Sequence, residues 1–514
     1  LYAATDDGQI RVTDDGGDNW YKINSFPGVP EYTYVYDLIA SKHDENVVFA
    51  AFNNHKSGDF TPYVYKSEDK GRTWASISGD LPEGAVYALE QDHVKKDILF
   101  AGTEYGAFVS LDGGNNWKQL KAGIPTINIR DMAIQEREND LVLASFGRGF
   151  YVLDNYAPMR EITAKVIDSP GYLFEVKDPL LFNTWRPLGG LGSRQRGFQG
   201  EDFFSAPNPE RGAVISYMVK EGVSSLEQER KKREAEAFKE KGDIPYPTLE
   251  EYKAEQEELP SYLIFTIKDD EGNFIRELRS PLRKGTAKIT WDLKYPSDLS
   301  VRSSQAAATS DLPSSNVFVL PGSYSVSMSQ NIKGQITELA GTVEFKVLEL
   351  DNRSIPAMDR EAMRDFKLKA LKLDNALRAA SSALSGMNEK TEFYKASTKA
   401  FSGQQAVDLM NEIRAMEKKL EEAQAALTGD PDYSTLDLDP VYSLRNRVRT
   451  AVYSVSGSSS DITGIAKENY EVAAEEFGPV YEQIKALVQE FEDFENKLDR
   501  MGAPTTPGRF PDWK

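Results

Sequence analysis

The sequence of 514 residues contains no cysteine and only three histidines. Without thiols the chain can form neither a disulfide nor a thiolate metal site. His43, His55 and His93 all lie early in the chain, and a surface or loop position is the expectation for each rather than the role of catalytic base. No metal site and no cofactor is predicted.

Positive charge is also in short supply, with 61 Lys and Arg against 81 Asp and Glu and a net charge of −20. Phosphate backbones bind clustered Lys and Arg, so no nucleic-acid partner is predicted. No apolar run reaches the ~20 residues that a membrane-spanning helix needs, so no membrane span is predicted. The sequence opens directly on a strand-like run at Leu1 with no signal peptide, and we expect it to be the C-terminal part of a longer protein.

What the sequence does contain is a motif of the form [Ser/Thr]-x-Asp-x-Gly-x-x-Trp, repeated three times in the first quarter of the chain. In each copy the Ser or Thr is expected to end a strand, and the Asp and Gly to form a hairpin turn. The Trp is expected to begin the next strand and to bury its ring between neighbouring blades. The motif positions are Thr13, Asp15, Gly17, Trp20, Ser67, Asp69, Gly71, Trp74, Ser110, Asp112, Gly114 and Trp117.

Three or four short alternating runs accompany each motif, and this number of strands per ~45 residues is typical of a β-propeller blade. A fourth copy is degenerate, because Phe150–Asp154 keeps the strand but lacks the Gly and Trp. Three blades and a fragment cannot close a ring. The missing blades are therefore expected from an upstream segment or from another chain.

The repeated motif is the pattern called the Asp-box, or BNR repeat. Residues 1–157 resemble the C-terminal blades of the Asp-box propellers found in sialidases, xyloglucan-cleaving glycosidases and sortilin-type receptors. In those families the Asp-box lies at the blade periphery, away from the substrate. The resemblance therefore implies a structural role for Asp15, Asp69 and Asp112.

Other acids are the candidates for catalysis. Asp37 and Asp131 occupy equivalent places in two of the runs, and Glu104 follows an inner hairpin strand. A glycosidase needs two carboxyl groups about 5–10 Å apart, which propeller geometry can supply. The alternative is that these acids bind turn amides or the guanidinium groups of Arg130 and Arg148. The arginine triad of sialidases is not recognised in the sequence.

The turn Phe146–Phe150 carries Arg148 between two glycines. Its guanidinium is a candidate for binding a carboxylate ligand, since arginine binds carboxylates in a bidentate manner. The alternative is that Arg148 pairs with an acid inside the propeller.

Residues 158–350 continue to alternate without the repeat, which predicts a β-sandwich. Parts of this stretch resemble the immunoglobulin-like module of flagellar hook-capping proteins, with Trp291 expected in the core. Two insertions interrupt it. The glycine-rich run 185–200 is interpreted as a surface or docking loop, because no helix follows as in a phosphate-binding loop. The charged run at about 224–259 predicts two helices, with capping boxes at Ser224 and Thr248.

From residue 355 to 500 apolar residues recur three and four positions apart, which predicts a helical bundle of about four helices. One such stripe consists of Leu409, Ile413, Met416, Leu420 and Ala423. An extended tail is expected at 501–514. No Glu-x-x-His pair occurs in the bundle sequence, so no di-iron site is predicted.

The expected fold class is multidomain and mainly β with an α C-terminal part: a partial β-propeller, an immunoglobulin-like β-sandwich and a helical bundle. This order resembles large exported bacterial proteins of the sortilin-like or glycosyl-hydrolase-like Asp-box type. The hypothesis is an exported, noncatalytic binding or scaffold protein, periplasmic, cell-surface or extracellular, with a protein, peptide or glycan ligand. Two alternatives stay open: a glycoside hydrolase of the sialidase or xyloglucanase type, and a sortilin-like peptide receptor.

Overall fold

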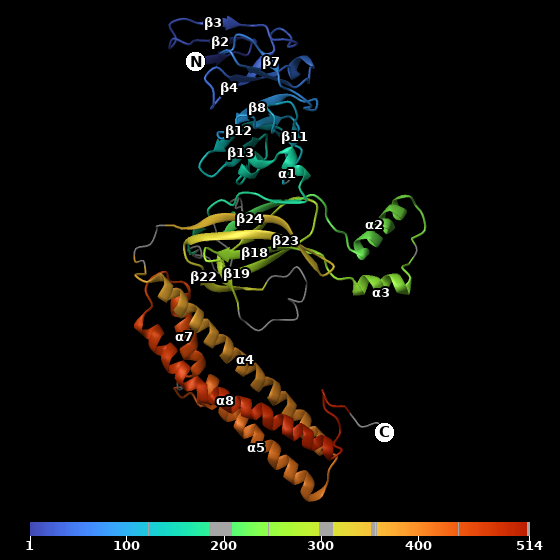
Figure 1. Ribbon diagram of the computed structural model, residues 1–514, viewed down its shortest axis with the longest axis vertical. Helices are drawn as coiled ribbons and strands as arrows, with labels where there is room; N and C mark the ends of the chain where they lie inside the picture. Colours follow the sequence, from blue (N-terminus) through green and yellow to red (C-terminus); the bar gives the residue numbers. More distant parts are fainter. Residues whose placement is uncertain are drawn as a thin grey trace. The chain divides into compact units, whose positions relative to one another are not determined.

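The computed structural model describes residues 1–121, 123–183, 208–244, 246–297, 312–350, 355, 357–439 and 442–510. The chain forms two compact units, Leu1–Phe174 and Glu175–Lys514, whose elements are coloured along the sequence in Figure 1. The glycine-rich run 185–200 and the end of the tail at 511–514 lie outside the described residues. The domain boundaries expected from the sequence stay a prediction.

The first unit contains four small antiparallel sheets that follow one another along the chain. In each sheet neighbouring strands in the sequence are neighbours in the sheet, as expected for hairpin-linked strands. The sheets consist of β1 (Tyr2–Ala4), β2 (Ile10–Val12) and β3 (Tyr21–Ile23); β4 (Tyr34–Ala40), β5 (Val48–Asn53), β6 (Tyr63–Ser67) and β7 (Ala75–Ser76); β8 (Val86–Gln91), β9 (Leu99–Thr103), β10 (Gly106–Ser110) and β11 (Lys118–Gln119); and β12 (Ile129–Gln135), β13 (Asp140–Ser145) and β14 (Phe150–Leu153).

A hydrophobic cluster lies between each pair of successive sheets. Phe52 of the second sheet packs with Ile10 of the first. Phe49, on the same strand, packs in the next cluster with Leu99 of the third sheet. Side chains alternate between the two faces of a strand, so each central sheet contributes to two clusters. This explains why β5 is buried at every position. The first unit is thus a partial β-propeller.

After the fourth sheet the chain turns through a 3-10 helix, Ala157–Glu161, and a short helix α1, Ala164–Asp168. Tyr156 leads into this segment and is fully buried. Its ring lies edge-on to Phe100 of β9, with 5.1 Å between the ring centroids. The segment therefore covers the cluster between the third and fourth sheets.

The second unit begins with an immunoglobulin-like β-sandwich. One of its sheets has five strands in the order β16-β24-β23-β18-β19. Trp291 is fully buried, as predicted, and lies 5.4 Å from the ring centroid of Tyr324 on β23. The last strand of the first unit is β15 (Gly171–Leu173). The strands of the second unit are β16 (Leu180–Leu181), β17 (Ala213–Val219), β18 (Tyr262–Asp269), β19 (Phe274–Pro281), β20 (Gly285–Trp291), β21 (Lys294–Pro296), β22 (Ser314–Phe318), β23 (Gly322–Ile332) and β24 (Gln335–Glu349).

Two helices, α2 (Leu226–Lys239) and α3 (Leu249–Glu257), lie between β17 and β18. Both begin with a capping box. The box at Thr248 is the one predicted. The prediction of a cap at Ser224 is wrong by one residue, because Ser225 is the N-cap and pairs with Gln228. Ser224 has Glu227 three residues later and Ser225 has Gln228, and either Glu or Gln can complete a capping box, so both serines fit the motif.

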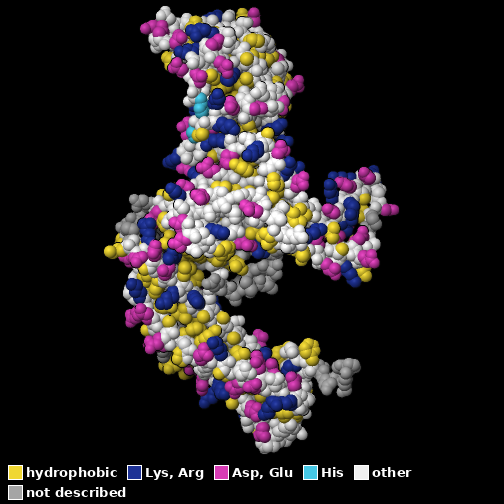
Figure 2. Space-filling view, in the orientation of Figure 1, with side chains coloured by type: hydrophobic (Ala, Val, Ile, Leu, Met, Phe, Trp, Pro, Cys, Tyr) yellow, Lys and Arg dark blue, Asp and Glu magenta, His cyan; other side chains and the backbone are white. Residues whose placement is uncertain are grey.

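The helical bundle packs four long helices, α4 (Arg360–Thr398), α5 (Gly403–Thr428), α7 (Leu444–Ser456) and α8 (Gly464–Arg500), with a short α6 (Pro431–Thr435) between α5 and α7. Their apolar stripes meet in one core. None of the described helices combines the length and apolar character needed to cross a membrane. Figure 2 shows acidic and basic side chains interspersed over the face in view.

Candidate functional site

The three Asp-box carboxylates are occupied within their own turns. Each accepts hydrogen bonds from the Ser or Thr hydroxyl two residues earlier and from the residue four positions later. For Asp69 these are the Ser67 hydroxyl at 2.8 Å and the Thr73 backbone N–H at 2.8 Å and hydroxyl at 2.7 Å. The bonds from Thr73 lower the pKa of Asp69 to about 2. Asp15 and Asp112 make the same contacts with Asn19 and Asn116.

The three Asp-box tryptophans differ in burial. Trp74 and Trp117 are 7% and 3% exposed, and each lies in the cluster shared with the preceding sheet. Trp20 is 44% exposed, so the prediction that its ring is buried between blades is wrong for this copy. The reason is that the ring packs toward the preceding sheet, and the first sheet has none in this sequence.

Asp37 is bound between two sheets. It lies on β4, where its Oδ1 accepts the N–H of Leu38 at 2.8 Å and its Oδ2 accepts the N–H of Leu89 on β8 at 2.7 Å. Burial raises the pKa of Asp37 against the opposing effect of these two N–H groups, and the charge of Asp131 raises it further. Both oxygens of Asp37 are therefore engaged by backbone amides.

Asp131 lies at the equivalent place on β12, and both residues follow a shift in strand register. Its Oδ1 accepts the N–H of Met132 at 2.8 Å, as Asp37 does with Leu38. Asp131 is exposed, unlike Asp37. Since Asp131 affects the pKa of Asp37, the structure brings these two candidate acids into electrostatic range.

Glu104, the third candidate acid, forms no hydrogen bond with Asp37 or Asp131 within the described part of the chain. It lies in the turn between β9 and β10 and is half-buried. Its Oε2 is a buried oxygen with no hydrogen-bond partner among the described residues.

Arg148 lies at the exposed tip of the hairpin between β13 and β14. The flanking Gly147 and Gly149 have φ of 82° and 69°, a left-handed conformation that favours glycine. The side chain of Arg148 is exposed, and the interpretation that it pairs with an acid inside the propeller stays a prediction. The role of Arg148 in binding a carboxylate ligand also stays a prediction.

A row of aromatic and guanidinium groups crosses the first strands of three successive sheets, and the sequence analysis missed it. We call it the Tyr–Arg row: Tyr34, Tyr36, Tyr87, Arg130 and Phe146. Neighbouring aromatic rings lie 5.2 Å and 5.0 Å apart between centroids. The Arg130 guanidinium lies 4.1 Å from the ring centroid of Tyr87 and 5.2 Å from that of Phe146. The row ends in exposed rings on both sides, Tyr34 at 37% and Phe146 at 66%.

The signal for this row was present in the sequence. Tyr36 and Arg130 directly precede Asp37 and Asp131, and Tyr87 holds the same place in the run between them. Three large planar groups at one repeat position are expected to stack when the repeats pack side by side.

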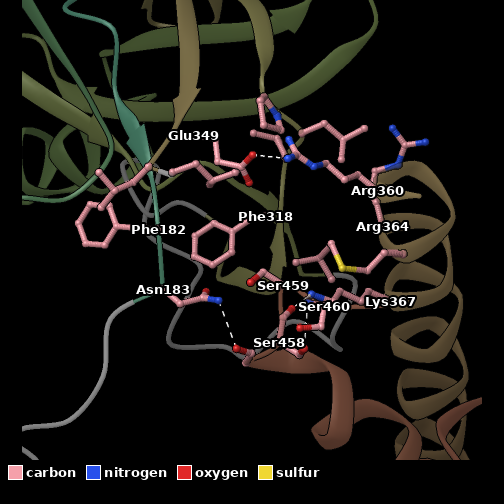
Figure 3. A pocket seen from close by; sticks show the side chains of 18 of the residues that line it. Phe182, Asn183, Phe318, Glu349, Arg360, Arg364, Lys367, Ser458, Ser459 and Ser460 are labelled. Atoms are coloured by element: carbon pink, nitrogen blue, oxygen red, sulfur yellow. Dashed lines mark hydrogen bonds and ion pairs between the residues drawn. The ribbon is translucent and has the colours of Figure 1, made fainter. Parts of the chain in front are cut away.

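Within the described residues, no group of three or more His, Cys, Asp or Glu side chains is placed to hold a metal ion. The second unit has one notable cavity, between the sandwich and the start of α4 (Figure 3). It contains none of the candidate residues from the sequence.

No model of a protein family matches this chain, and no curated protein matches it. Among solved structures, the GH74 enzyme of Niastella koreensis is 17% identical over 42% of this chain and 33% of its own, with a TM-score of 0.26. YCF48 from Cyanidioschyzon merolae is 14% identical over 34% of this chain and 59% of its own, with a TM-score of 0.23. The extracellular domain of BT4673 from B. thetaiotaomicron is 13% identical over 68% of this chain and 36% of its own, with a TM-score of 0.19.

In each case the match spans less than two thirds of the solved chain. At these TM-scores the likenesses carry no argument about fold or activity. The β-propeller character of the first unit follows from its own sheets and the clusters between them.

Proposed function

We propose that this chain is an exported, noncatalytic binding or scaffold protein whose first unit binds a protein, peptide or glycan along the Tyr–Arg row. The observation that carries the proposal is the row itself, which joins three strands and ends in the exposed rings of Tyr34 and Phe146. Flat aromatic faces beside a guanidinium suit sugar rings and extended peptide side chains, because both present apolar surface next to polar groups.

Asp37, which follows Tyr36 of the row, supports binding over catalysis. A general acid or nucleophile must reach its substrate with a free oxygen. Both oxygens of Asp37 accept backbone N–H groups, so this carboxylate fastens one sheet to the next. Asp37 is therefore assigned a structural role in the proposal.

Further blades from an upstream segment or another chain belong to the same proposal. Trp20 is exposed where its two equivalents are covered by a preceding sheet. At the other end, Asp131 accepts the N–H of Met132. Asp37 also accepts an N–H from the next sheet, and among the described propeller sheets none follows the fourth to donate such an N–H to Asp131. The exposed Trp20 ring at one end and the Asp131 carboxylate at the other are thus the places where further blades would make the contacts seen between the inner sheets.

A binding experiment tests the proposal. The full chain is immobilised and presented with a xyloglucan oligosaccharide, sialyllactose and a library of extended peptides. For the probe that binds, Tyr34→Ala and Phe146→Ala are expected to weaken affinity by about tenfold or more, as aromatic anchors do. Phe274→Ala, at a ring in the second unit that is 60% exposed, is the control and retains affinity. Binding by none of the probes, or equal affinity in all three variants, contradicts the proposal.

One observation favours a second candidate, a glycoside hydrolase. Burial raises the pKa of Asp37 and the charge of Asp131 adds to this, and a carboxyl group with a raised pKa beside a second carboxyl group is the arrangement of a glycosidase acid. Release of sugar from xyloglucan and sialyllactose by the full chain distinguishes the two. Turnover that disappears in both Asp37→Asn and Asp131→Asn supports the hydrolase, whereas binding without turnover supports the first proposal.

A further inference from the structure

The second unit contains a cavity of about 580 Å³. Its walls come from five segments far apart in the sequence: Leu181–Asn183 at the end of β16, Val317–Pro321 at the end of β22, Glu349 and Leu350 at the end of β24, the first two turns of α4, and residues 453–460 at the end of α7 and after it. Figure 3 shows side chains from these segments pointing into one space. Pockets that hold small molecules have volumes of about 300–1,000 Å³, so this cavity has the right size for a ligand.

Three cations of α4 line the cavity: Arg360, Arg364 and Lys367. They are spaced four and three residues apart, which places them on one face of the helix. Arg360 forms an ion pair with Glu349, the only acidic residue among those that line the cavity. Arg364 is paired with its neighbour Asp365 at 2.7 Å.

Lys367 differs from the two arginines because the described residues provide it with no carboxylate. Its Nζ donates to the backbone carbonyl of Ser458 at 2.7 Å. An ammonium group has three N–H donors, so this bond leaves two for other acceptors. Burial lowers the pKa of Lys367 to about 8. A half-buried ammonium without a carboxylate partner is costly, and a bound anion would relieve that cost.

More positive charge lies against the apolar side of the cavity. The ring of Phe318 has the Arg211 guanidinium at 5.0 Å and the Lys294 ammonium at 5.1 Å from its centroid. The pKa of Lys294 is lowered by burial and also by the charges of Arg211 and Arg276, although Asp292 opposes this. These cations gather in a chain whose net charge is −20.

We propose that this cavity binds a small organic anion, with its charged group at Lys367 and Arg364 and its uncharged body against Phe318. The charged group is a carboxylate or a phosphate, since both accept hydrogen bonds from Lys and Arg. The site is distinct from the Tyr–Arg row, which lies in the first unit.

Calorimetric titration of the full chain with two sugars that differ in their acidic group tests the site. Glucuronate carries a carboxylate and glucose 6-phosphate a phosphate, and neutral glucose and inorganic phosphate are the comparisons. At least one of the two acidic sugars is expected to bind, and more tightly than either comparison. If the wild-type chain binds neither acidic sugar at millimolar concentration, the proposal is overturned.

Variants of α4 localise the binding. Lys367→Met removes the charge at nearly constant length and is expected to weaken binding by about tenfold or more, the usual effect of losing a charge-assisted hydrogen bond. Lys367→Arg keeps the charge and retains most of the affinity. Lys372→Met, at an exposed lysine of the same helix, is the matched control and binds like the wild type. Equal affinity in Lys367→Met and Lys372→Met overturns the assignment of the anion to this cavity.

Discussion

Arg160 binds Asp92 through two hydrogen bonds, from Nε to Oδ2 at 2.9 Å and from Nη2 to Oδ1 at 2.6 Å. The hydroxyl of Tyr156 donates to the same Oδ1 at 2.5 Å. Asp92 is fully buried and lies directly after β8, whereas Arg160 lies beyond the fourth sheet in the 3-10 helix. The pair therefore fastens the segment that leaves the fourth sheet to the third sheet.

Replacing Arg160 by Met is expected to destabilise the first unit by about 3–5 kcal/mol, because it leaves a buried carboxylate without its charge partner. Denaturant unfolding of the full chain measures the loss. Arg137→Met is the control, since the Arg137–Glu138 pair is exposed and such pairs contribute at most about 1 kcal/mol. Equal midpoints for the two variants would contradict the role of the Asp92–Arg160 pair.

The same pair predicts a dependence on acid. Burial raises the pKa of Asp92, but the hydrogen bonds from Arg160 and Tyr156 outweigh it, so the pKa lies below its ordinary value of 3.8. A carboxyl group whose pKa is lower in the folded state stabilises the fold above its unfolded pKa, and that stabilisation disappears as the pH falls through the folded value. The stability of wild type relative to Asp92→Asn should therefore shrink below about pH 4. A constant difference between pH 7 and pH 2 would show that Asp92 does not carry this effect.

The Asp-box tryptophans provide a matched pair of substitutions. Trp117→Ala removes a ring that is 3% exposed and is expected to cost about 3–5 kcal/mol in unfolding free energy. Trp20→Ala removes the ring of the same motif at 44% exposure, and a cost within about 1 kcal/mol is expected. Thermal or denaturant unfolding compares them directly. Similar losses for both would mean that Trp20 is covered in solution.

The Lys367 ammonium predicts a dependence on alkaline pH in the ligand-free chain. Its pKa is about 8 in the folded state against 10.5 ordinarily, so the unfolded chain binds more protons between these values and stability rises with pH across that window. The other charged residues that line the cavity are Arg360 and Arg364 on the same helix and Glu349 on β24. Lys367→Met should lack this rise, and Lys372→Met should keep it. A rise of equal size in Lys367→Met would exclude Lys367 as its source.

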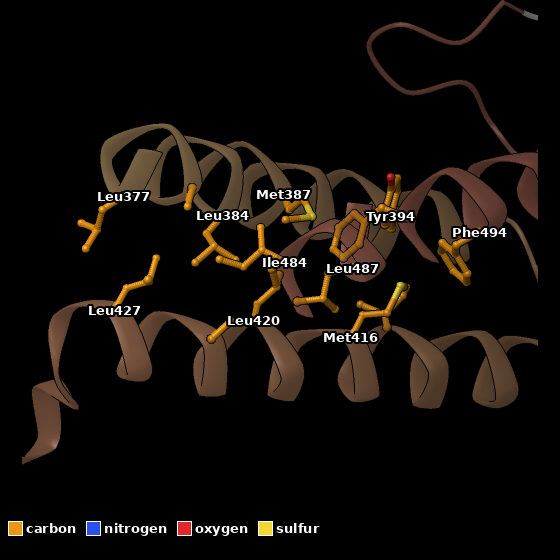
Figure 4. Packing of buried hydrophobic residues seen from close by; sticks show 14 of the residues in the cluster. Leu377, Leu384, Met387, Tyr394, Met416, Leu420, Leu427, Ile484, Leu487 and Phe494 are labelled. Atoms are coloured by element: carbon orange, nitrogen blue, oxygen red, sulfur yellow. The ribbon is translucent and has the colours of Figure 1, made fainter. Parts of the chain in front are cut away.

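Local patterns predicted much of the fold. The Asp-box repeats indicated a propeller because turn residues and strand alternation are set within a few positions of the sequence. The residues of the bundle core could be predicted for the same reason, because apolar residues recur every three or four positions along a helix. The predicted stripe of Leu409, Ile413, Met416, Leu420 and Ala423 is buried at every position. Figure 4 shows side chains of α5 facing those of α4 and α8 in this core.

Contacts between sheets could not be predicted in the same way. The burial of Trp20 depends on a neighbouring sheet, and the motif alone does not show whether that sheet is present. Asp37 was recognisable as an unusual acid in its run. Its partner Leu89 is on a different sheet, and no local pattern indicates which amide will face the carboxylate. The second-unit cavity could not be predicted, because its five wall segments are far apart in the sequence and come together only on folding.

The dependence of each sheet on its neighbours has a consequence for the order of unfolding. Among the described sheets, the first contributes to one cluster, whereas the second and third each contribute to two. In stacked architectures, stability is roughly a sum of interface terms, so the unit with the fewest interfaces opens first. Amide hydrogens of β1–β3 should therefore exchange with solvent well before those of β5 and β9, and opening should spread inward from that end.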